Sequence, residues 1–363
     1  MRKINQIEPW LGIEEKRAVI DYLDSGAWLT EFKKTREFER IFADYVGSKY
    51  ACAVCNGTIS LVVALMTLGI GRKDEVIVPD FTMIATANAV TLIGAKPILV
   101  DINLGNLCLD LEKTKKAITS RTKAILYVSL NGRSHNMESV INLAKEHNLY
   151  LIEDAAQSLG SKYNGKFLGT FGDIGSFSLS YPKIITTGQG GVLVTDNPEF
   201  YEKMSMIKDF GRQRSGIDVS EVIGLNAKFT DLQAVIGIEQ MKKLDWRVKR
   251  KKEIFNRYRE LLGEEQGIQF IETSPDVAPW FIDILTGEQR ELSLFLKDKG
   301  IGTRPFYLPI HNQVPYSQIN IDFWNSEYIS KYGLWLPSSS FLKDEEVDYI
   351  CNHIRQFLER RLR

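Results

Sequence analysis

GSFSLSYPKIITTGQGG, residues 175–191, is the stretch from which we infer the fold of this chain. The alternation of residues 176–180 predicts a short strand. Pro182 fixes the backbone and lacks an N–H, so it ends that strand just before Lys183. The glycines that follow let the backbone approach a ligand closely. A lysine in a turn is usually a surface charge. An amine held in a tight pocket can instead form a Schiff base with an aldehyde cofactor.

A carboxylate ends an upstream apolar run, residues 149–152, which predicts a buried strand. The carboxyl ends of parallel strands are where α/β proteins bind ligands. Pyridoxal phosphate needs an acid there to keep its ring nitrogen protonated. We assign that role to Asp154, with a helix N-cap as the alternative. Glu153 is the weaker candidate, because it points to the opposite face of the strand.

The turn Cys55-Asn56-Gly57-Thr58 joins a strand predicted over 50–54 to an apolar helix. A helix N-terminus offers free N–H groups and the positive end of the helix dipole, so this turn is a candidate phosphate site. An ordinary capped turn is the alternative, and it is the simpler interpretation of this feature alone. Neither a Walker loop nor a G-x-G-x-x-G motif occurs in the sequence, which counts against a nicotinamide-dependent Rossmann oxidoreductase.

Together with residues 78–90, 151–178 and 304–311, these segments resemble the DegT/DnrJ/EryC1/StrS aminotransferases over nearly the whole chain. The resemblance implies a pyridoxal-phosphate enzyme of fold type I. That α/β fold has a mostly parallel central sheet flanked by helices and a smaller C-terminal α+β domain. Within the family, the pattern K-x-I-T-T-G-x-G-G of residues 183–191 is most similar to the perosamine-synthase-like 4-aminotransferases.

The resemblance also implies roles for single residues. Lys183 matches the lysine that carries the cofactor, and Asp154 matches the partner of the ring nitrogen. The other positions that match cofactor contacts are Gly57, Thr58 and Ser178 at the phosphate, Gln157 at the 3-hydroxyl, and Asn226, which reaches the phosphate from the neighbouring subunit. This last role implies at least a homodimer with shared active sites.

Two positions depart from the family pattern. Met83 occupies the position where relatives commonly stack a tyrosine or tryptophan on the cofactor ring, and a thioether packs there less rigidly. Lys228 stands where an arginine is frequent, although the two cations are not interchangeable at a bidentate site.

Four residues are expected near the substrate. Trp28 falls in a region that borders the substrate pocket in relatives, and a packed tryptophan is the alternative. Arg304 belongs to a segment that covers the substrate in relatives, so its planar guanidinium is a candidate clamp for a carboxylate or phosphate. Pairing with a surface acid is the alternative for Arg304. Tyr307 and His311 are candidate sugar contacts.

The implied reaction moves an amino group from L-glutamate to a nucleotide-linked keto sugar, a 4-keto-6-deoxyhexose, for amino-sugar and surface polysaccharide biosynthesis. Amination at carbon 3 is one alternative. A family dehydratase is another, but in those enzymes a histidine replaces the lysine that is present here as Lys183. A non-catalytic sensor on the same fold is the third.

The composition bounds the class of protein. The chain has 363 residues with 46 basic and 46 acidic side chains, and 44% of its residues are hydrophobic. This composition and length predict a globular protein of two domains. The pattern of elements and the family resemblance imply residues 1–240 as the domain with the cofactor site and residues 241–363 as the smaller domain. Zero formal charge argues against a nucleic-acid partner. Without an apolar run of membrane length or a signal peptide, we expect a cytoplasmic protein without membrane partners.

Other polar groups suggest little further chemistry. Cys52 and Cys55 form a CxxC inside a strand pattern, which favours small buried side chains over a metal or redox site. The histidines show no paired metal spacing, so no metal is expected. Arg133 is interpreted as a loop surface charge, with an anion contact as the alternative. The basic run 242–252 is interpreted as a solvated helix face, with attraction of a nucleotide diphosphate as the alternative.

The hydrophobic pattern between residues 50 and 196 alternates strands with helices. Further strands are predicted over 75–78, 97–101, 124–128, 150–153, 176–179 and 191–195, and helices over 86–92, 134–147 and 199–208. One or two long helices are predicted over 229–262. The last third has predicted short elements over 268–271 and 280–286 and helices over 291–299 and 345–360.

Overall fold

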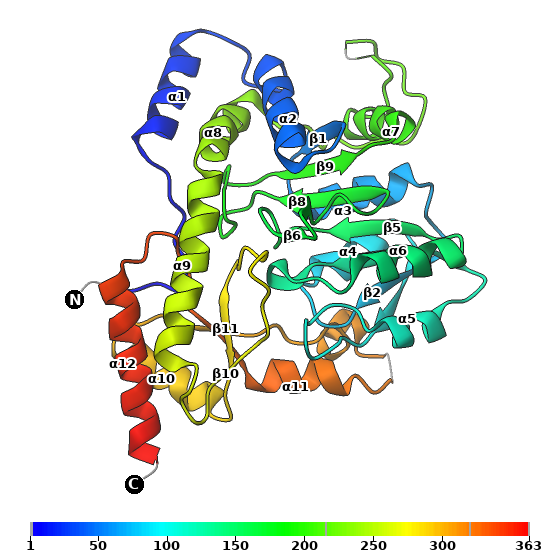
Figure 1. Ribbon diagram of the computed structural model, residues 1–363. Coiled ribbons are helices and arrows are strands. Elements are labelled where there is room, and N and C mark those ends of the chain that lie inside the picture. The colour runs from blue at the N-terminus through cyan, green and yellow to red at the C-terminus, as the bar shows by residue number, and fades with distance from the viewer. Residues whose placement is uncertain (1–2, 215, 319–320, 362–363) are drawn as a thin grey trace.

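A seven-stranded sheet forms the centre of the larger part of the molecule (Figure 1). The computed structural model describes residues 3–214, 216–318 and 321–361. The strand order is β1-β9-β8-β5-β4-β2-β3. The strands are β1 (Tyr50–Val54), β2 (Glu75–Pro79), β3 (Lys96–Val100), β4 (Thr122–Val128), β5 (Tyr150–Asp154), β8 (Ile174–Ser178) and β9 (Gly191–Thr195).

The sheet is mostly parallel. Strands β3, β2, β4, β5 and β8 pair parallel to one another, whereas β9 runs antiparallel to both β8 and β1. All five residues of β2, β8 and β9 are buried, as expected for strands covered on both faces. The predicted α/β fold with a mostly parallel sheet is therefore confirmed.

Helices cover both faces of this sheet (Figure 1). On one face, α3 (Gly57–Thr67), α4 (Ala85–Leu92) and α7 (Pro198–Lys208) pack on the side chains of Val54, Val78 and Ile152. On the other face, α2 (Lys33–Val46) and α8 (Asp231–Lys242) cover β1, β9 and β8. Helix α6 (Met137–Glu146) covers β2 and β4 on that same face, and α5 (Leu111–Ala117) lies beside α6.

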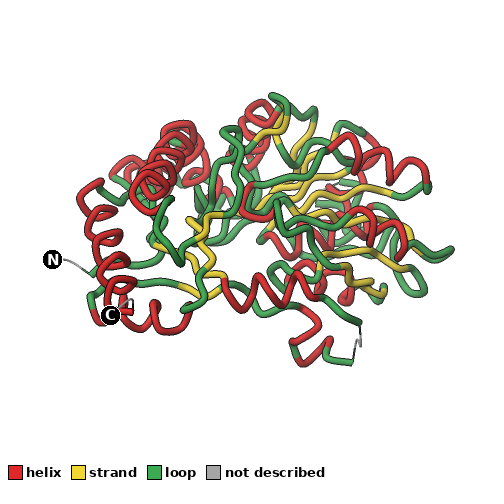
Figure 2. Tube along the Cα trace, turned by 60° about the horizontal axis from the view of Figure 1, so that its bottom comes forward, coloured by secondary structure: helices red, strands yellow, loops and turns green. Residues whose placement is uncertain are grey.

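A smaller antiparallel sheet lies beside the large one, and the strands form two separate groups in Figure 2. Its order is β10-β11-β13-β12, with β10 (Gln269–Phe270), β11 (Ile282–Leu285), β12 (Arg304–Pro305) and β13 (Gly333–Leu336). Helices α9 (Leu244–Leu262), α10 (Gln289–Asp298) and α12 (Asp344–Arg361) share a hydrophobic core with this sheet. The remaining elements are α1 (Ile13–Asp24), α11 (Trp324–Tyr332), the pair β6 (Lys162–Tyr163) and β7 (Lys166–Phe167), and short 3-10 turns at 130–132, 310–312 and 314–316.

The predicted strands of the large sheet are all present, and their ends differ from the observed ones by at most two residues. The run 229–262 forms two helices, because α8 ends at Lys242 and α9 begins at Leu244. The pattern did not predict α2, α5, α11 or β13. The division near residue 240 falls inside the last turn of α8, and it stays a prediction. None of the helices in the described ranges is long and apolar enough to span a bilayer.

Candidate active site

A cavity of about 590 Å³ opens at the carboxyl end of the large sheet. Seven of the predicted cofactor-binding residues line it: Gly57, Thr58, Met83, Asp154, Gln157, Ser178 and Lys183. They come from the start of α3, the loop after β2, the end of β5 and the segment after β8. The fold thus brings together residues that are up to 126 positions apart in the chain, the separation of Gly57 and Lys183.

The start of α3 forms one wall of the cavity. The Asn56 side chain accepts the N–H of Ile59 at 2.9 Å and so caps the helix. The first N–H groups of a helix have no intrahelical acceptor, so those of Gly57 and Thr58 remain for an anion. A Cβ on Gly57 would lie 2.9 Å from the Cβ of Ser178, and therefore only glycine lets α3 approach β8 this closely.

Asp154 lies at the end of β5 and is 6% exposed. Its Oδ2 accepts the hydroxyl of Thr86 at 2.8 Å, and its Oδ1 accepts the N–H of Ala156 at 3.2 Å. Burial raises the pKa of Asp154, against the opposing effects of Thr86, Ala156 and the charge of Lys183. A cation placed beside a buried carboxylate stabilises its charged form. The site therefore fits a ring nitrogen that carries a proton.

Gln157 is oriented by the backbone of the 3-10 turn that follows β4. The N–H of Asn131 donates to Oε1 of Gln157 at 2.9 Å. The amide NH₂ is then the group that Gln157 presents to the cavity, and it can only donate hydrogen bonds. This polarity fits the ring oxygen that the family resemblance places at Gln157.

Lys183 follows Pro182 on the segment after β8, where its backbone N–H donates to Ser180 at 3.0 Å. Burial lowers the pKa of its amine to about 8, with Arg304 adding to this effect and Asp154 opposing it. Near neutral pH an appreciable fraction of such amines is uncharged, which a nucleophile or a general base requires.

Arg304 lies on β12 of the smaller sheet and Tyr307 lies two residues after that strand, and neither is among the residues that line the cavity around Lys183. Both residues are nevertheless linked electrostatically to the site. The charge of Arg304 lowers the pKa of Lys183. The pKa of Tyr307 is raised mainly by burial, and the charge of Asp154 adds to that rise. The guanidinium lies 5.5 Å from the Tyr307 ring and 5.4 Å from the ring of Trp335. Among the described residues, the side-chain contacts of Arg304 are these two rings and not the acid expected as its alternative partner. The exposed guanidinium is thus held by aromatic rings and stays available to an anion.

His311 is buried and bonded to a carboxylate. Its backbone N–H donates to Oδ1 of Asp80 at 2.9 Å, and its ring Nδ1 lies 2.7 Å from Oδ2. The ring also stacks on Phe323, with centroids 4.7 Å apart. These contacts fasten the segment after β12 to the end of β2, and a sugar contact for His311 stays a prediction.

Trp28 and Asn226 lie away from the cavity around Lys183 in this chain. Trp28 is 67% exposed and stacks on Phe32, so the interpretation as a packed side chain is wrong for the single chain. It borders a different cavity of about 490 Å³ beside Asp231. Asn226 is exposed on the segment that follows the loop after α7. Whether either residue serves a partner's site stays a prediction.

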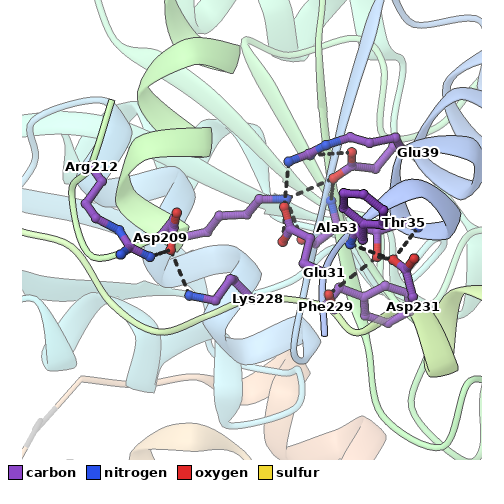
Figure 3. Close-up of polar contacts among 12 residues, drawn as sticks. Glu31, Thr35, Glu39, Ala53, Asp209, Arg212, Lys228, Phe229 and Asp231 are labelled. Atoms are coloured by element: carbon purple, nitrogen blue, oxygen red, sulfur yellow. Dashed lines mark hydrogen bonds and ion pairs between the residues drawn. The ribbon is translucent and has the colours of Figure 1, made fainter. Parts of the chain in front are cut away.

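A buried ionic network supports the strand that leads to Gly57 (Figure 3). Lys208, at the end of α7, donates to Glu39 at 2.9 Å and to the carbonyl of Ala53 at 3.2 Å, and it lies 3.2 Å from Glu31. Glu39 in turn accepts the N–H of Ala53 at 2.8 Å. Because these groups are buried, the pairing fixes the end of β1 just before the turn that begins α3.

The same region shows how Lys228 is used (Figure 3). Its Nζ lies 2.7 Å from Oδ1 of Asp209, which also pairs with Arg212 at 2.5 Å. Backbone bridges join Asn226 to Asp209 and Lys228 to Val54. The ion pair of Lys228 thus holds the Asn226 segment against the residue that follows α7, and the backbone bridge to Val54 holds it against β1.

Two interpretations of basic residues are wrong. Arg133 is neither a surface charge nor an anion contact, because its guanidinium is buried and forms two hydrogen bonds of 2.7 Å to Asp283. The run 242–252 is not wholly a solvated face, because Arg247 and Lys251 are both 2% exposed. Their donors satisfy backbone carbonyls of distant segments, which the local pattern does not reveal.

Two residues at the site were missed by the sequence reasoning. Thr86 donates to Asp154, and Trp280 places its ring 3.9 Å from Nζ of Lys183. Thr86 lies on the first turn of α4, within the segment 78–90 that carries the family resemblance. Its place in that segment could have indicated a residue near the cofactor. Trp280 lies two residues before β11 of the smaller sheet, and no local pattern links it to Lys183. The four cysteines are free, and the described residues contain no cluster of metal-ligating side chains.

Comparisons with known proteins agree with this geometry. The chain matches the DegT/DnrJ/EryC1/StrS aminotransferase family over residues 10–355. It is 38% identical to the GDP-perosamine synthase of Escherichia coli O157:H7 over 362 aligned residues. The alignment covers 98% of this chain and 99% of that protein. It is 33% identical over 376 residues to the spore coat polysaccharide biosynthesis protein SpsC of Bacillus subtilis, covering 97% and 96% of the two chains.

The fold is shared with solved structures of the same kind. The X-ray structure of S. venezuelae DesV in complex with a ketimine intermediate superimposes with a TM-score of 0.91 at 31% identity, covering 96% of this chain and 95% of that one. The match of the family over almost the full length, together with these relatives, confirms the predicted family and fold. The chain belongs to the DegT/DnrJ/EryC1/StrS aminotransferase family.

Proposed function

We propose that this protein is a pyridoxal-phosphate-dependent aminotransferase that moves the amino group of L-glutamate to a nucleotide-linked keto sugar. The observation that carries the proposal is one cavity in which Lys183 and Asp154 meet the N-terminus of α3. An amine, an acid and an anion site are the three groups that pyridoxal phosphate requires. When bound, the cofactor supplies a cationic ring that accepts the electron pair of the broken C–H bond.

The residues of this chain divide the remaining work. Lys183, with its lowered pKa, attaches the cofactor through its amine and, once released, carries the proton between donor carbon and cofactor. Asp154 holds the proton of the ring nitrogen in place. The N–H groups of Gly57 and Thr58, with the hydroxyl of Ser178, bind the phosphate, and the NH₂ of Gln157 donates to the 3-hydroxyl.

The substrate class rests on the relatives and on Arg304. Relatives are named GDP-perosamine synthase and spore coat polysaccharide biosynthesis protein, which supports a 4-keto-6-deoxyhexose substrate and a role in amino-sugar and surface polysaccharide biosynthesis. The exposed guanidinium of Arg304 suits the carboxylate of glutamate or the diphosphate of the sugar nucleotide. The charges of Arg304 and Asp154 both act on Tyr307, which supports this residue as the candidate contact for a sugar hydroxyl.

The proposal includes a cytoplasmic homodimer with shared active sites. Asn226 is exposed and does not line the cavity of its own chain. The loop before it also exposes apolar side chains, with Ile223 85% and Val219 64% exposed. A second copy that covers this loop would bury that apolar surface and bring Asn226 to the partner's cavity.

The test separates cofactor attachment from amino transfer. Wild-type protein incubated with pyridoxal phosphate is expected to gain a visible absorbance band, to lose it on addition of L-glutamate, and to release 2-oxoglutarate. A GDP-linked 4-keto-6-deoxyhexose should then be aminated. K183A should show no band and no product, whereas K242A, which removes an exposed helix lysine, should behave as wild type. A wild-type protein that stays colourless after reconstitution would refute the proposal.

A further inference from the structure

Trp280 contacts Lys183 and the residue before it. This tryptophan precedes β11 and is 4% exposed. Its ring lies 3.9 Å from Nζ of Lys183, and its indole N–H donates to the carbonyl of Pro182 at 2.6 Å. One side chain from the smaller sheet therefore touches both the amine and the backbone that carries it.

The residue after Lys183 is held from α9. Arg247 donates to the carbonyl of Ile184 at 2.9 Å and to the carbonyl of Trp10 at 2.7 Å. Because Arg247 is buried and these acceptors are fixed backbone groups, the bonds restrict the position of Ile184. The carbonyls on both sides of Lys183 thus accept hydrogen bonds from buried side chains that lie outside its own segment.

Lys251, one turn further along α9, holds the backbone of Trp280. Its Nζ donates to the carbonyl of Trp280 at 2.5 Å and to the carbonyl of Ser338. The hydroxyl of Ser338 accepts the N–H of Ile282, two residues after Trp280, at 2.8 Å. The backbone at the start of β11 is therefore anchored to α9 and to the segment after β13, and the indole ring has a fixed place to project from.

We propose that Trp280 is a positioning residue for Lys183. Its ring holds the ε-amine, and its N–H holds the carbonyl of Pro182. Arg247 restrains the backbone of Ile184, and Lys251 restrains the backbone of Trp280 itself. The inference rests on the proposed function only in taking Lys183 as the reacting amine. The ring face attracts the charged form of that amine. The other charged groups that act on Lys183 are Asp154 from β5 and Arg304 from β12, and the variants below leave both in place.

The test measures Lys183 itself in the full-length protein freed of cofactor. Trace labelling with an amine-reactive anhydride between pH 6 and 11, read by mass spectrometry of the Lys183 peptide, gives the pKa of the amine. W280L removes the ring face and is expected to lower that pKa by roughly half to one and a half pH units. W280F keeps a ring face and is expected to shift it less. An unchanged or higher pKa in W280L overturns the proposal.

Hydrogen exchange tests the bond to Pro182 separately. W280F lacks the indole N–H, so the backbone amides of residues 183–187 should exchange several-fold faster than in wild type. F255L is the matched control, because Phe255 is a buried aromatic residue in the core of the smaller sheet without contact to Lys183. It should change neither the pKa nor this exchange, and exchange in W280F equal to that in F255L contradicts the role of the N–H.

These readouts do not depend on pyridoxal phosphate. If wild-type protein shows no visible band after reconstitution, the proposed function is refuted, and the result for Trp280 is unaffected. A visible band in wild type, together with a pKa of Lys183 that is unchanged in both W280L and W280F, would overturn this inference alone. Circular dichroism and thermal unfolding of each variant establish that the measured chains are folded.

Discussion

The backbone N–H of Asn131 donates to Oε1 of Gln157 at 2.9 Å, and this bond decides which end of the Gln157 amide faces the cavity. Asn131 is fixed in turn, because its side-chain amide bonds Asp283 at 2.7 Å and both backbone groups of Phe281. Its φ of 51° lies in the left-handed region, which asparagine tolerates better than most residues. The orientation of a cofactor-facing group is therefore set by contacts that extend to the smaller sheet.

Replacing Gln157 by glutamate should weaken binding of pyridoxal phosphate by roughly tenfold or more, since a donor to the ring oxygen is lost and a negative charge replaces it. The acceptor for Asn131 is kept, so the cofactor-free protein should still fold, and the buried new carboxylate should lower its unfolding temperature. Fluorescence titration with the cofactor measures the first effect and thermal unfolding the second. Equal affinity in wild type and Q157E would show that the amide does not donate to the cofactor.

Gly57→Ala should impair phosphate binding in particular. The new Cβ would lie 2.9 Å from Cβ and 3.0 Å from Oγ of Ser178, so the start of α3 must move away from β8. Affinity for pyridoxal phosphate should fall, while affinity for pyridoxal, which lacks the phosphate, should fall less. Gly71→Ala is the control, because its Cβ would meet nothing closer than 3.9 Å. A parallel loss for both ligands would contradict a phosphate role for this turn.

The sequence predicted the large sheet and the cavity around Lys183 because both depend on local signals. Continuous apolar runs such as β2 mark strands covered on two faces, and their carboxyl ends mark the site. Asn56 and Gly57 indicate the capped start of a helix. These signals lie within a few residues of the groups that they position, so a single sequence can reveal them.

Contacts between the two sheets were not predictable in this way. The partner of Arg133 is Asp283, 150 residues later, and nothing near either residue indicates the pairing. For α9 a signal was present, because Arg247 and Lys251 fall on the same helical face as Leu244, Ile254 and Tyr258. Periodicity could therefore have placed both cations on the buried face, although it could not have named the carbonyls that accept their hydrogen bonds.

The buried pair of Arg133 and Asp283 should respond strongly to loss of one partner. The two side chains are 2% and 1% exposed, and a single substitution leaves one buried charge without its partner. R133M or D283L should each cost about 3 to 5 kcal/mol of unfolding free energy. The double variant should cost less than the sum of the two, as measured by urea unfolding of all four proteins. The more exposed pair of Lys34 and Glu37, whose side chains are 38% and 37% exposed, is the control, with an expected cost below about 1 kcal/mol. Additive losses at Arg133 and Asp283 would show that the pair is not coupled.

Lys251 should make the stability of the protein depend on pH. Burial lowers the pKa of its amine from 10.5 to about 7, so between these values the unfolded chain binds a proton that the folded chain does not. Stability attributable to this group therefore rises as pH climbs through that window, by at most about 1.4 kcal/mol per pH unit, and is level below it. K251M removes the titrating group, so the difference in unfolding free energy between wild type and K251M should slope upward from about pH 7. K249M changes an exposed lysine of the same helix and should run parallel to wild type at every pH. A difference between wild type and K251M that stays constant from pH 6 to pH 10 would mean that Lys251 remains charged in the folded protein, paired only with the carbonyls of Trp280 and Ser338.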